Sequence, residues 1–230
     1  MYYPFFDSTW LIVLPGLLIA IWAQFKVKAA FSKYSKVASQ SGMTGAMVAR
    51  AMLDGAGLRD VPIYRAQGSL TDHYDPVKRT LNLSQDVYDS CSIAALGVAA
   101  HECGHAIQDL ESYSPLKLRS AVVPMVSIGS NLSWPIFLMG IVFSWQPLLM
   151  AGIILFSLTV LFTLITLPVE FNASSRALLA LESGNYLRGQ ELDGARKVLS
   201  AAALTYVAAA LNAILQLLRL LALAGRHSRD

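Results

Sequence analysis

The residues of this sequence with the clearest chemistry are two histidines and a glutamate in the segment 98–108, VAAHECGHAIQ. His101 and His105 are four positions apart, so on a helix both imidazoles lie on one face and can hold a single metal ion. Glu102 is offset by one position and can accept a proton from a water molecule beside that metal. Zinc suits the pattern H-E-x-x-H, because it makes hydroxide available near neutral pH. The pattern therefore predicts metal-assisted hydrolysis.

The alternative is that the pattern is a chance string in a structural helix, since short motifs also occur in unrelated proteins. The chain has only four histidines, and two of them flank a glutamate in an otherwise apolar segment. Polar side chains in such surroundings are costly to bury without partners. We therefore favour the metal site over the structural interpretation.

The elements that position this motif belong to a membrane protein. The chain has 230 residues, of which 55% are hydrophobic and 14% charged, whereas soluble domains have about 25% charged residues. Long stretches lack charge altogether, which is typical of integral membrane proteins. The net charge of +3, with no basic and aromatic pattern, argues against a nucleic-acid partner.

Three apolar segments indicate membrane helices, and a fourth is ambiguous. The first, 10–25, is expected to be an uncleaved anchor and not a signal peptide, because no Lys or Arg precedes it and the basic residues follow it. Those lysines should remain in the cytoplasm. Segments 121–143 and 148–169 contain no charged residue and form a predicted hairpin. Segment 201–224 is either a fourth span or a helix that packs on the catalytic segment or lies at the interface. We favour the second option, because Asn212, Gln216 and Arg219 would share one face.

The main polar part of the chain is expected to carry the catalytic helix and a short pair of strands. Thr44 is a candidate N-cap for a helix over 44–56, and the motif helix is expected over 90–110. The segments 61–68 and 79–84 alternate like strands, with a polar turn between them. The predicted organisation is an anchor (1–25), a cytoplasmic catalytic segment (26–118), a transmembrane hairpin (119–169), and a third-ligand helix with a C-terminal helical region (170–230).

A catalytic zinc commonly has three protein ligands, so a third must come from elsewhere in the chain. His73 and His227 are candidates by residue type, but Glu170 is the strongest. It directly follows an apolar segment, and the predicted topology returns it to the membrane surface that carries the motif helix. A carboxylate at the membrane edge requires compensation, which a metal would supply. The alternative is a solvated acid at a helix N-terminus.

Other residues with metal-binding side chains are expected to have structural roles. Cys103 is two positions from His101 and lies on another face of the helix, so we expect it to pack in the interior. Asp72 and Asp75 are followed by too few oxygen ligands for a calcium loop and are expected to be turn residues.

Three sequence motifs together resemble those of a known family. They are 70–84 (LTDHYDPVKRTLNLS), 98–108 and 167–178 (LPVEFNASSRAL), in this order. Over nearly its whole length the chain resembles the YugP family of neutral zinc metallopeptidases of bacterial membranes. It is more distantly similar to HtpX-like and CaaX-type membrane proteases. The resemblance implies a mainly α, gluzincin-like integral membrane protein with three to four transmembrane helices and a small α+β catalytic segment.

The same resemblance implies the role of each site residue. His101 and His105 match the zinc histidines, Glu102 the general base, and Glu170 the later glutamate ligand. HtpX-like proteins have an aspartate four residues after that glutamate, where this chain has Ser174. Asn172 or Ser174 could instead hold the second ring nitrogen of a ligating histidine.

The predicted function is that of a membrane-embedded metalloendopeptidase with one Zn²⁺ per chain. His73, Arg176 and Tyr206 are candidates for stabilising the oxyanion of the reaction. His73 could alternatively cap a turn, and Arg176 could be a solvated charge. The alternative function is a non-catalytic metal-binding scaffold or sensor.

The expected partners are a peptide or membrane-protein substrate and the lipid bilayer; a homo-oligomer or a regulatory membrane partner is left open. The expected location is the bacterial inner membrane, with the protein crossing it several times and the active site at the cytoplasmic face.

Overall fold

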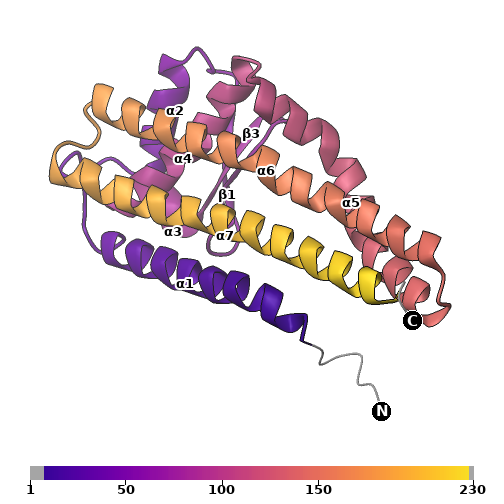
Figure 1. The fold of residues 1–230 in the computed structure, drawn as a ribbon. Coiled ribbons are helices and arrows are strands. Elements are labelled where there is room, and N and C mark those ends of the chain that lie inside the picture. Colours follow the sequence, from indigo (N-terminus) through magenta and orange to yellow (C-terminus); the bar gives the residue numbers. More distant parts are fainter. Residues whose placement is uncertain (1–7, 228–230) are drawn as a thin grey trace. The chain divides into compact units, whose positions relative to one another are not determined.

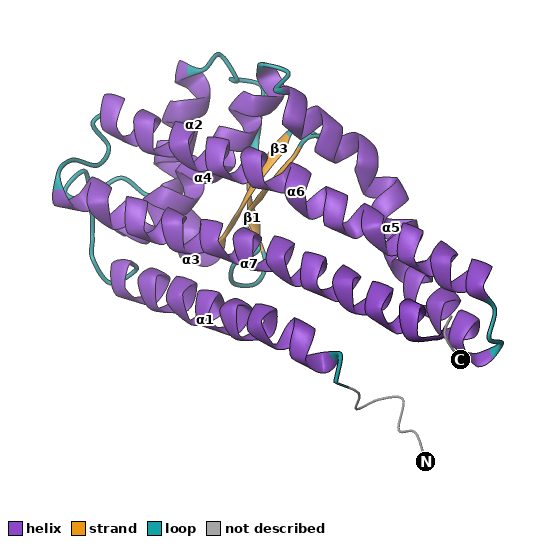
Figure 2. Ribbon diagram, in the orientation of Figure 1, coloured by secondary structure: helices purple, strands orange, loops and turns teal. Residues whose placement is uncertain are grey.

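The computed structural model describes residues 8–227, which form seven helices and three short strands (Figures 1 and 2). The predicted fold class, a mainly helical membrane protein with a small sheet, is confirmed. The chain divides into two compact units. The helical unit comprises Met1–Gln24, Leu118–Leu167 and Thr205–Asp230, and the site unit comprises Phe25–Lys117 and Pro168–Leu204.

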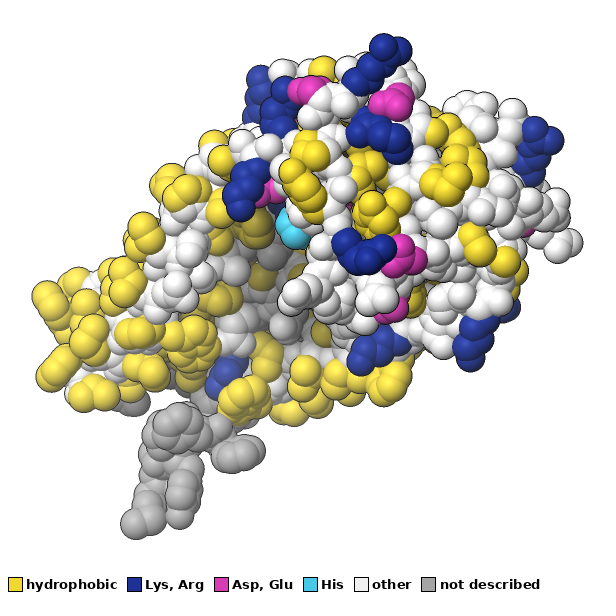
Figure 3. All heavy atoms as spheres, turned by 180° about the vertical axis from the view of Figure 1, so that it is seen from behind, with side chains coloured by type: hydrophobic (Ala, Val, Ile, Leu, Met, Phe, Trp, Pro, Cys, Tyr) yellow, Lys and Arg dark blue, Asp and Glu magenta, His cyan; other side chains and the backbone are white. Residues whose placement is uncertain are grey.

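Four helices are long and apolar enough to cross a membrane. They are α1 (Trp10–Tyr34), α5 (Ser114–Val142), α6 (Gln146–Ser183) and α7 (Gln190–His227). These helices expose large apolar side chains, such as Leu11 (69% exposed) and Ile128 (63%). On the face seen in Figure 3, charged side chains gather over one part of the surface and hydrophobic side chains cover much of the rest. Such large apolar surfaces are stable in contact with lipid.

Helix α7 contains the last apolar segment, for which the sequence left a membrane span open. It continues without interruption from Gln190 to His227, and its apolar part is a candidate span. Two of its polar residues contact α1 within the helical unit. Asn212 lies against Gly16, and Arg219 donates to Thr9 and stacks on the ring of Trp10 at 3.8 Å. The shared polar face that we took as evidence against a span is thus satisfied, in part, by a neighbouring helix.

Close helix packing in the helical unit depends on glycine. A side chain at Gly152 of α6 would lie 2.7 Å from Cβ of Phe137 on α5, and one at Gly140 would lie 2.6 Å from the backbone of Leu149. Phe137 and Leu149 are buried in a core that also contains Leu220 of α7. The predicted hairpin is therefore formed by α5 and α6, with a short turn between them.

The site unit is built around α4 (Ile93–Leu110), which carries the H-E-x-x-H pattern. Ser92 caps this helix by accepting a hydrogen bond from Ala95 N at 3.2 Å, so α4 begins slightly later than predicted. Helix α2 (Gly45–Gly55) packs beside it, and its predicted N-cap, Thr44, accepts from Met47 N. The core between them contains mainly small and branched residues, including Val48, Leu53, Leu96 and Ala99.

The sheet has one strand more than the pair we predicted. Strands β1 (Ile63–Ala66) and β3 (Thr80–Ser84) pair in parallel, and β2 (His73–Asp75) pairs antiparallel to the other side of β3. The segment predicted as a polar turn thus contains the edge strand β2. The short helix α3 (Gln85–Tyr88) directly follows β3. Three residues are too few to show an alternating pattern. Tyr74 stabilises this strand by donating from its hydroxyl to Asp109 of α4 at 2.9 Å.

Candidate metal centre

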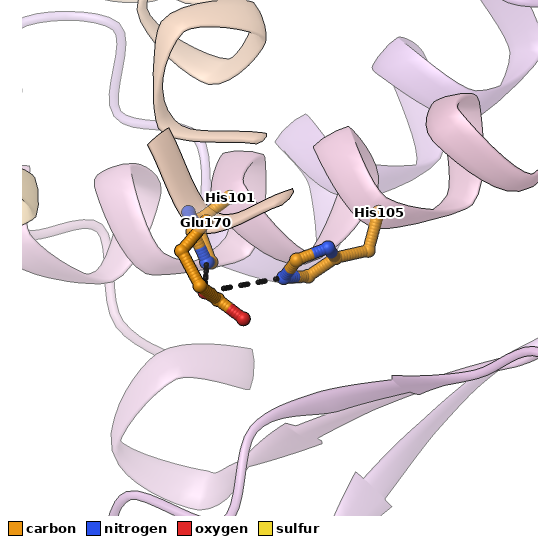
Figure 4. A group of neighbouring side chains, drawn as sticks. All are labelled: His101, His105 and Glu170. Carbon is orange, nitrogen blue, oxygen red and sulfur yellow. Dashed lines mark hydrogen bonds and ion pairs between the residues drawn. The ribbon is translucent and has the colours of Figure 1, made fainter. Parts of the chain in front are cut away.

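His101, His105 and Glu170 converge in the site unit (Figure 4). Nε2 of His101 lies 3.2 Å from Oε2 of Glu170, and Nε2 of His105 lies 3.6 Å from the same oxygen. All three side chains are largely buried, with exposed fractions of 15%, 12% and 3%. The structure thus brings together the three residues that the sequence predicted as ligands.

The donor set fits a zinc ion. Two imidazole nitrogens and one carboxylate oxygen form one of the ligand sets of catalytic zinc. Ligand atoms each about 2.1 Å from a tetrahedral ion lie roughly 3.4 Å apart, and the two nitrogen–oxygen distances of 3.2 and 3.6 Å lie on either side of that value. Two of the three ligand separations therefore suit one zinc ion, and all three ligand atoms lie within 4.8 Å of one another.

Gly104 explains how α6 comes close enough to supply the third ligand. A Cβ atom at this position would lie 2.7 Å from the carbonyl oxygen of Ala173 on α6. Ala173 is three residues after Glu170, so both face the same side of α6. The absence of a side chain at Gly104 thus brings the backbone of α6 against α4 and directs Glu170 toward the two histidines.

Each of the two candidate ligand histidines has a polar partner on its second ring nitrogen. Nδ1 of His101 lies 3.1 Å from Oγ of Ser174, one of the two residues we considered for this role. Nδ1 of His105 lies 3.0 Å from Oε1 of Gln108. Because an amide oxygen only accepts, this contact is a hydrogen bond donated by a protonated Nδ1. A proton held on Nδ1 leaves the lone pair of Nε2 available for a metal.

Gln108 is a polar contact of the candidate metal centre that the sequence analysis missed. It is fully buried, and its Nε2 donates to the carbonyl of Val169 and to Oδ1 of Asn172, both at 2.9 Å. Gln108 is a polar residue three positions after His105 in an apolar helix, and this spacing could have identified it as a partner of that histidine. These hydrogen bonds orient Gln108 so that its carbonyl oxygen faces His105.

Asn172 and Arg176 extend this network away from the metal ligands. Oδ1 of Asn172 also accepts from Nε of Arg176 at 2.7 Å, and Nη2 of Arg176 contacts Oε2 of Glu111 at 2.6 Å. The Arg176 guanidinium holds the pKa of Glu111 below its usual range. The guanidinium of Arg176 thus binds Asn172 and Glu111 and does not point at His101, His105 or Glu170. Its suggested role in stabilising the oxyanion stays a prediction.

Glu102 lies beside the ligands but is not one of them. Its side chain is 9% exposed, and Oε2 accepts a hydrogen bond from the backbone N–H of Tyr74 on β2 at 3.1 Å. The edge strand therefore fixes the orientation of this carboxylate.

Burial, together with the neighbouring Asp109 carboxylate, raises the pKa of Tyr74 to about 12.

The structure does not place the other candidate residues, His73 and Tyr206, among the three candidate ligands. His73 is exposed on β2, with Nδ1 2.8 Å from the carbonyl of Thr71, and strand alternation points its ring to the face opposite Tyr74. Tyr206 is on α7 in the helical unit. The catalytic roles suggested for both stay predictions. The side chain of His227 lies outside the described part of the structure.

The residues expected to be structural have the contacts of structural residues. Cys103 is fully buried against α2, with Sγ 3.6 Å from the carbonyl of Ala49, and burial raises the pKa of its thiol. Asp72 accepts from the backbone and hydroxyl of Ser84, and Asp75 caps the turn after β2. The structure thus supports the packing and turn roles predicted for them.

Comparison with known proteins agrees with this site. The family described as "Putative neutral zinc metallopeptidase" matches residues 9–225 of the chain. The chain is 52% identical over 208 residues to the protein named "Putative membrane protease YugP" of Bacillus subtilis (strain 168), with 90% of this chain and 92% of that protein covered. No solved structure matches the chain. The chain therefore belongs to this family of neutral zinc metallopeptidases.

Proposed function

We propose that the protein is a zinc-dependent metalloendopeptidase of the membrane that hydrolyses peptide bonds. The observation that carries this proposal is the convergence of His101, His105 and Glu170 beside Glu102, which lies next to the ligands without joining them. A site that served only to bind metal would have no need of an oriented carboxylate at this position. The name of the Bacillus subtilis relative supports the same reaction class.

His101, His105 and Glu170 would hold the zinc ion, while Ser174 and Gln108 orient the two imidazole rings. When bound, zinc acts as a Lewis acid and lowers the pKa of water to about 7. Glu170 is almost completely buried, so its carboxylate is held away from bulk water. The site is thus preorganised for one metal ion per chain.

Glu102 acts as the general base and then as the general acid. Its carboxylate takes a proton from the water that attacks the scissile carbonyl and returns that proton to the leaving amine. The Tyr74 N–H holds Oε2, which leaves Oε1 to receive the proton. His73, Arg176 and Tyr206 are the candidates for donating to the oxyanion; Arg176 is the least available, since its donors bind Asn172 and Glu111.

The site is proposed to face the cytoplasm from the bacterial inner membrane. Four lysines, Lys26, Lys28, Lys33 and Lys36, lie at or just after the C-terminal part of α1. Basic residues flanking a span favour the cytoplasmic side. Membrane proteins or membrane-proximal peptides are therefore the proposed substrates.

The experiment that tests the function measures zinc content and cleavage in the same sample. The purified chain in detergent should contain about one zinc ion and cleave an unfolded protein such as casein. A chelator should abolish cleavage, and added zinc should restore it. A chain that holds zinc but cleaves no substrate in this assay would instead be a metal-binding scaffold or sensor.

A further inference from the structure

A second site lies in the site unit, between the C-terminal part of α1 and the N-terminal part of α7. The two helices run antiparallel there, and the ring of Tyr34 packs against the backbone of Gly194. A cavity of about 500 Å³ lies between them. It shares no residue with the metal centre.

The charge of this cavity has one sign. Among the described residues, its lining includes Lys26 and Lys33 of α1 and Arg196 and Lys197 of α7, and no carboxylate. All four side chains are exposed. Charges of one sign in a shared concavity repel one another and attract counter-ions. The cavity therefore favours an anionic occupant.

Among the described residues, no carboxylate forms an ion pair with Lys33, Arg196 or Lys197. Glu191 accepts a hydrogen bond from the backbone of Gln40 at 2.8 Å, which directs its carboxylate to that segment. Asp193 is one turn before Lys197, yet among the described residues the ion pairs include neither of them. Lys33 lies 5.4 Å from the ring of Tyr34 instead of beside a carboxylate.

The cavity also has an apolar lining. It is formed by small and branched residues from both helices, namely Ala29, Ala30, Ala201 and Leu204. A ligand that fits both parts of the cavity must therefore combine a negative group with a hydrocarbon portion.

The cavity also lies where both helices change from charged to apolar. In α1 no charged residue occurs from Trp10 to Phe25, and in α7 none occurs between Lys197 and Arg219. Both helices are candidate membrane spans. The phosphate groups of a bilayer lie at such a transition, and basic pockets between membrane helices bind anionic headgroups.

We propose that this cavity binds an anionic phospholipid, with the phosphate group between Lys33, Arg196 and Lys197 and the upper acyl chain against the apolar lining. The lipid would connect α1 to α7 at the boundary of the site unit. This proposal does not depend on peptidase activity.

The test uses two double variants that remove the same charge. Lys33→Gln with Lys197→Gln alters the cavity, whereas Lys28→Gln with Lys36→Gln alters exposed lysines of the same region that do not line it. Binding of short-chain phosphatidylglycerol to the full chain in neutral detergent is measured at low salt, because salt screens such contacts. Short-chain phosphatidylcholine and glycerol phosphate serve as the zwitterionic and soluble probes.

The wild type should bind phosphatidylglycerol at least about fivefold more tightly than phosphatidylcholine. The cavity variant should lose about tenfold in affinity, and the control variant less than about twofold. Equal loss in both variants would show that binding follows net charge and would overturn the proposal. So would equal binding of the two lipids, no binding of phosphatidylglycerol, or glycerol phosphate binding as tightly as the lipid. Zinc content and melting temperature of both variants should equal those of the wild type.

Discussion

His105 and Gln108 form a hydrogen-bonded pair on α4, with Nδ1 of the histidine 3.0 Å from Oε1 of the glutamine. Because Gln108 is itself held by Val169 and Asn172 of α6, the helix that supplies the third ligand also orients a ligand on α4. The metal centre is therefore one connected structure across both helices.

Replacing Gln108 with leucine should weaken zinc binding, since the His105 ring would lose its acceptor. Outer partners of metal ligands typically contribute about 10–100-fold in affinity. Zinc affinity is measured by competition with a chelator, and the melting temperature of the metal-free protein separates this effect from loss of folding. An unchanged affinity in a folded variant would show that Gln108 has only a packing role.

Ser174 offers a cleaner comparison, because a second serine follows it. Ser174→Ala removes the contact to Nδ1 of His101, whereas the hydroxyl of Ser175 donates to the carbonyl of Phe171 on its own helix. Ser174→Ala should lower zinc affinity by about tenfold, and Ser175→Ala should leave it unchanged. Equal effects of the two substitutions would contradict the role assigned to Ser174.

Two glycines of α4 test the packing that brings α6 to the site. A Cβ at Gly104 would lie 2.7 Å from Ala173 O, whereas one at Gly97 would meet Ala195 at an ordinary 3.5 Å. Gly104→Ala should destabilise the protein by about 1–3 kcal/mol and lower zinc occupancy. Gly97→Ala should change stability by no more than about 1 kcal/mol. The melting temperature and the zinc content of both variants give the comparison, and a tolerated Gly104→Ala would show that the close approach is not required.

The phenol of Tyr74 should make stability fall at high pH. Its pKa is raised from 10.0 to about 12 in the folded protein by burial and by the Asp109 carboxylate. The neutral phenol therefore contributes stability that is complete below pH 10 and is lost as the pH rises toward 12. Thermal melts between these pH values should show a decline in the wild type that is smaller in Tyr74→Phe. Tyr64→Phe, at an exposed position, controls for loss of a phenol hydroxyl. Identical profiles for the wild type and Tyr74→Phe would contradict this account.

The part of the site that depends on local spacing could be predicted from the sequence. The four-residue interval between His101 and His105 fixes their shared face once the segment is helical, and Ser92 caps that helix near the expected start. Glu170 was identified from topology, because the hairpin returns the chain to the same side. These inferences need only helix geometry and the length of apolar segments.

The parts that were missed depend on contacts between distant residues. Strand β2 is held by β3 and by the hydroxyl of Tyr74 on Asp109, which no local pattern reveals. Gln108 contacts residues 61 and 64 positions away. The polar face of α7 was taken as a sign against a span, yet Asn212 and Arg219 contact α1. Each polar residue had a partner that only the tertiary structure supplies.

The central claim, that Glu102 performs the chemistry while His101, His105 and Glu170 hold the metal, is tested most directly with two variants assayed side by side. Glu102→Gln keeps a side chain of similar shape but removes the base, so it should retain about one zinc ion per chain and lose cleavage of casein by at least about 100-fold. Glu170→Gln should lose zinc itself, whereas Glu182→Gln, an exposed position on the same helix, should retain both zinc and activity. Cleavage by Glu102→Gln at the wild-type rate, with zinc bound, would contradict the claim.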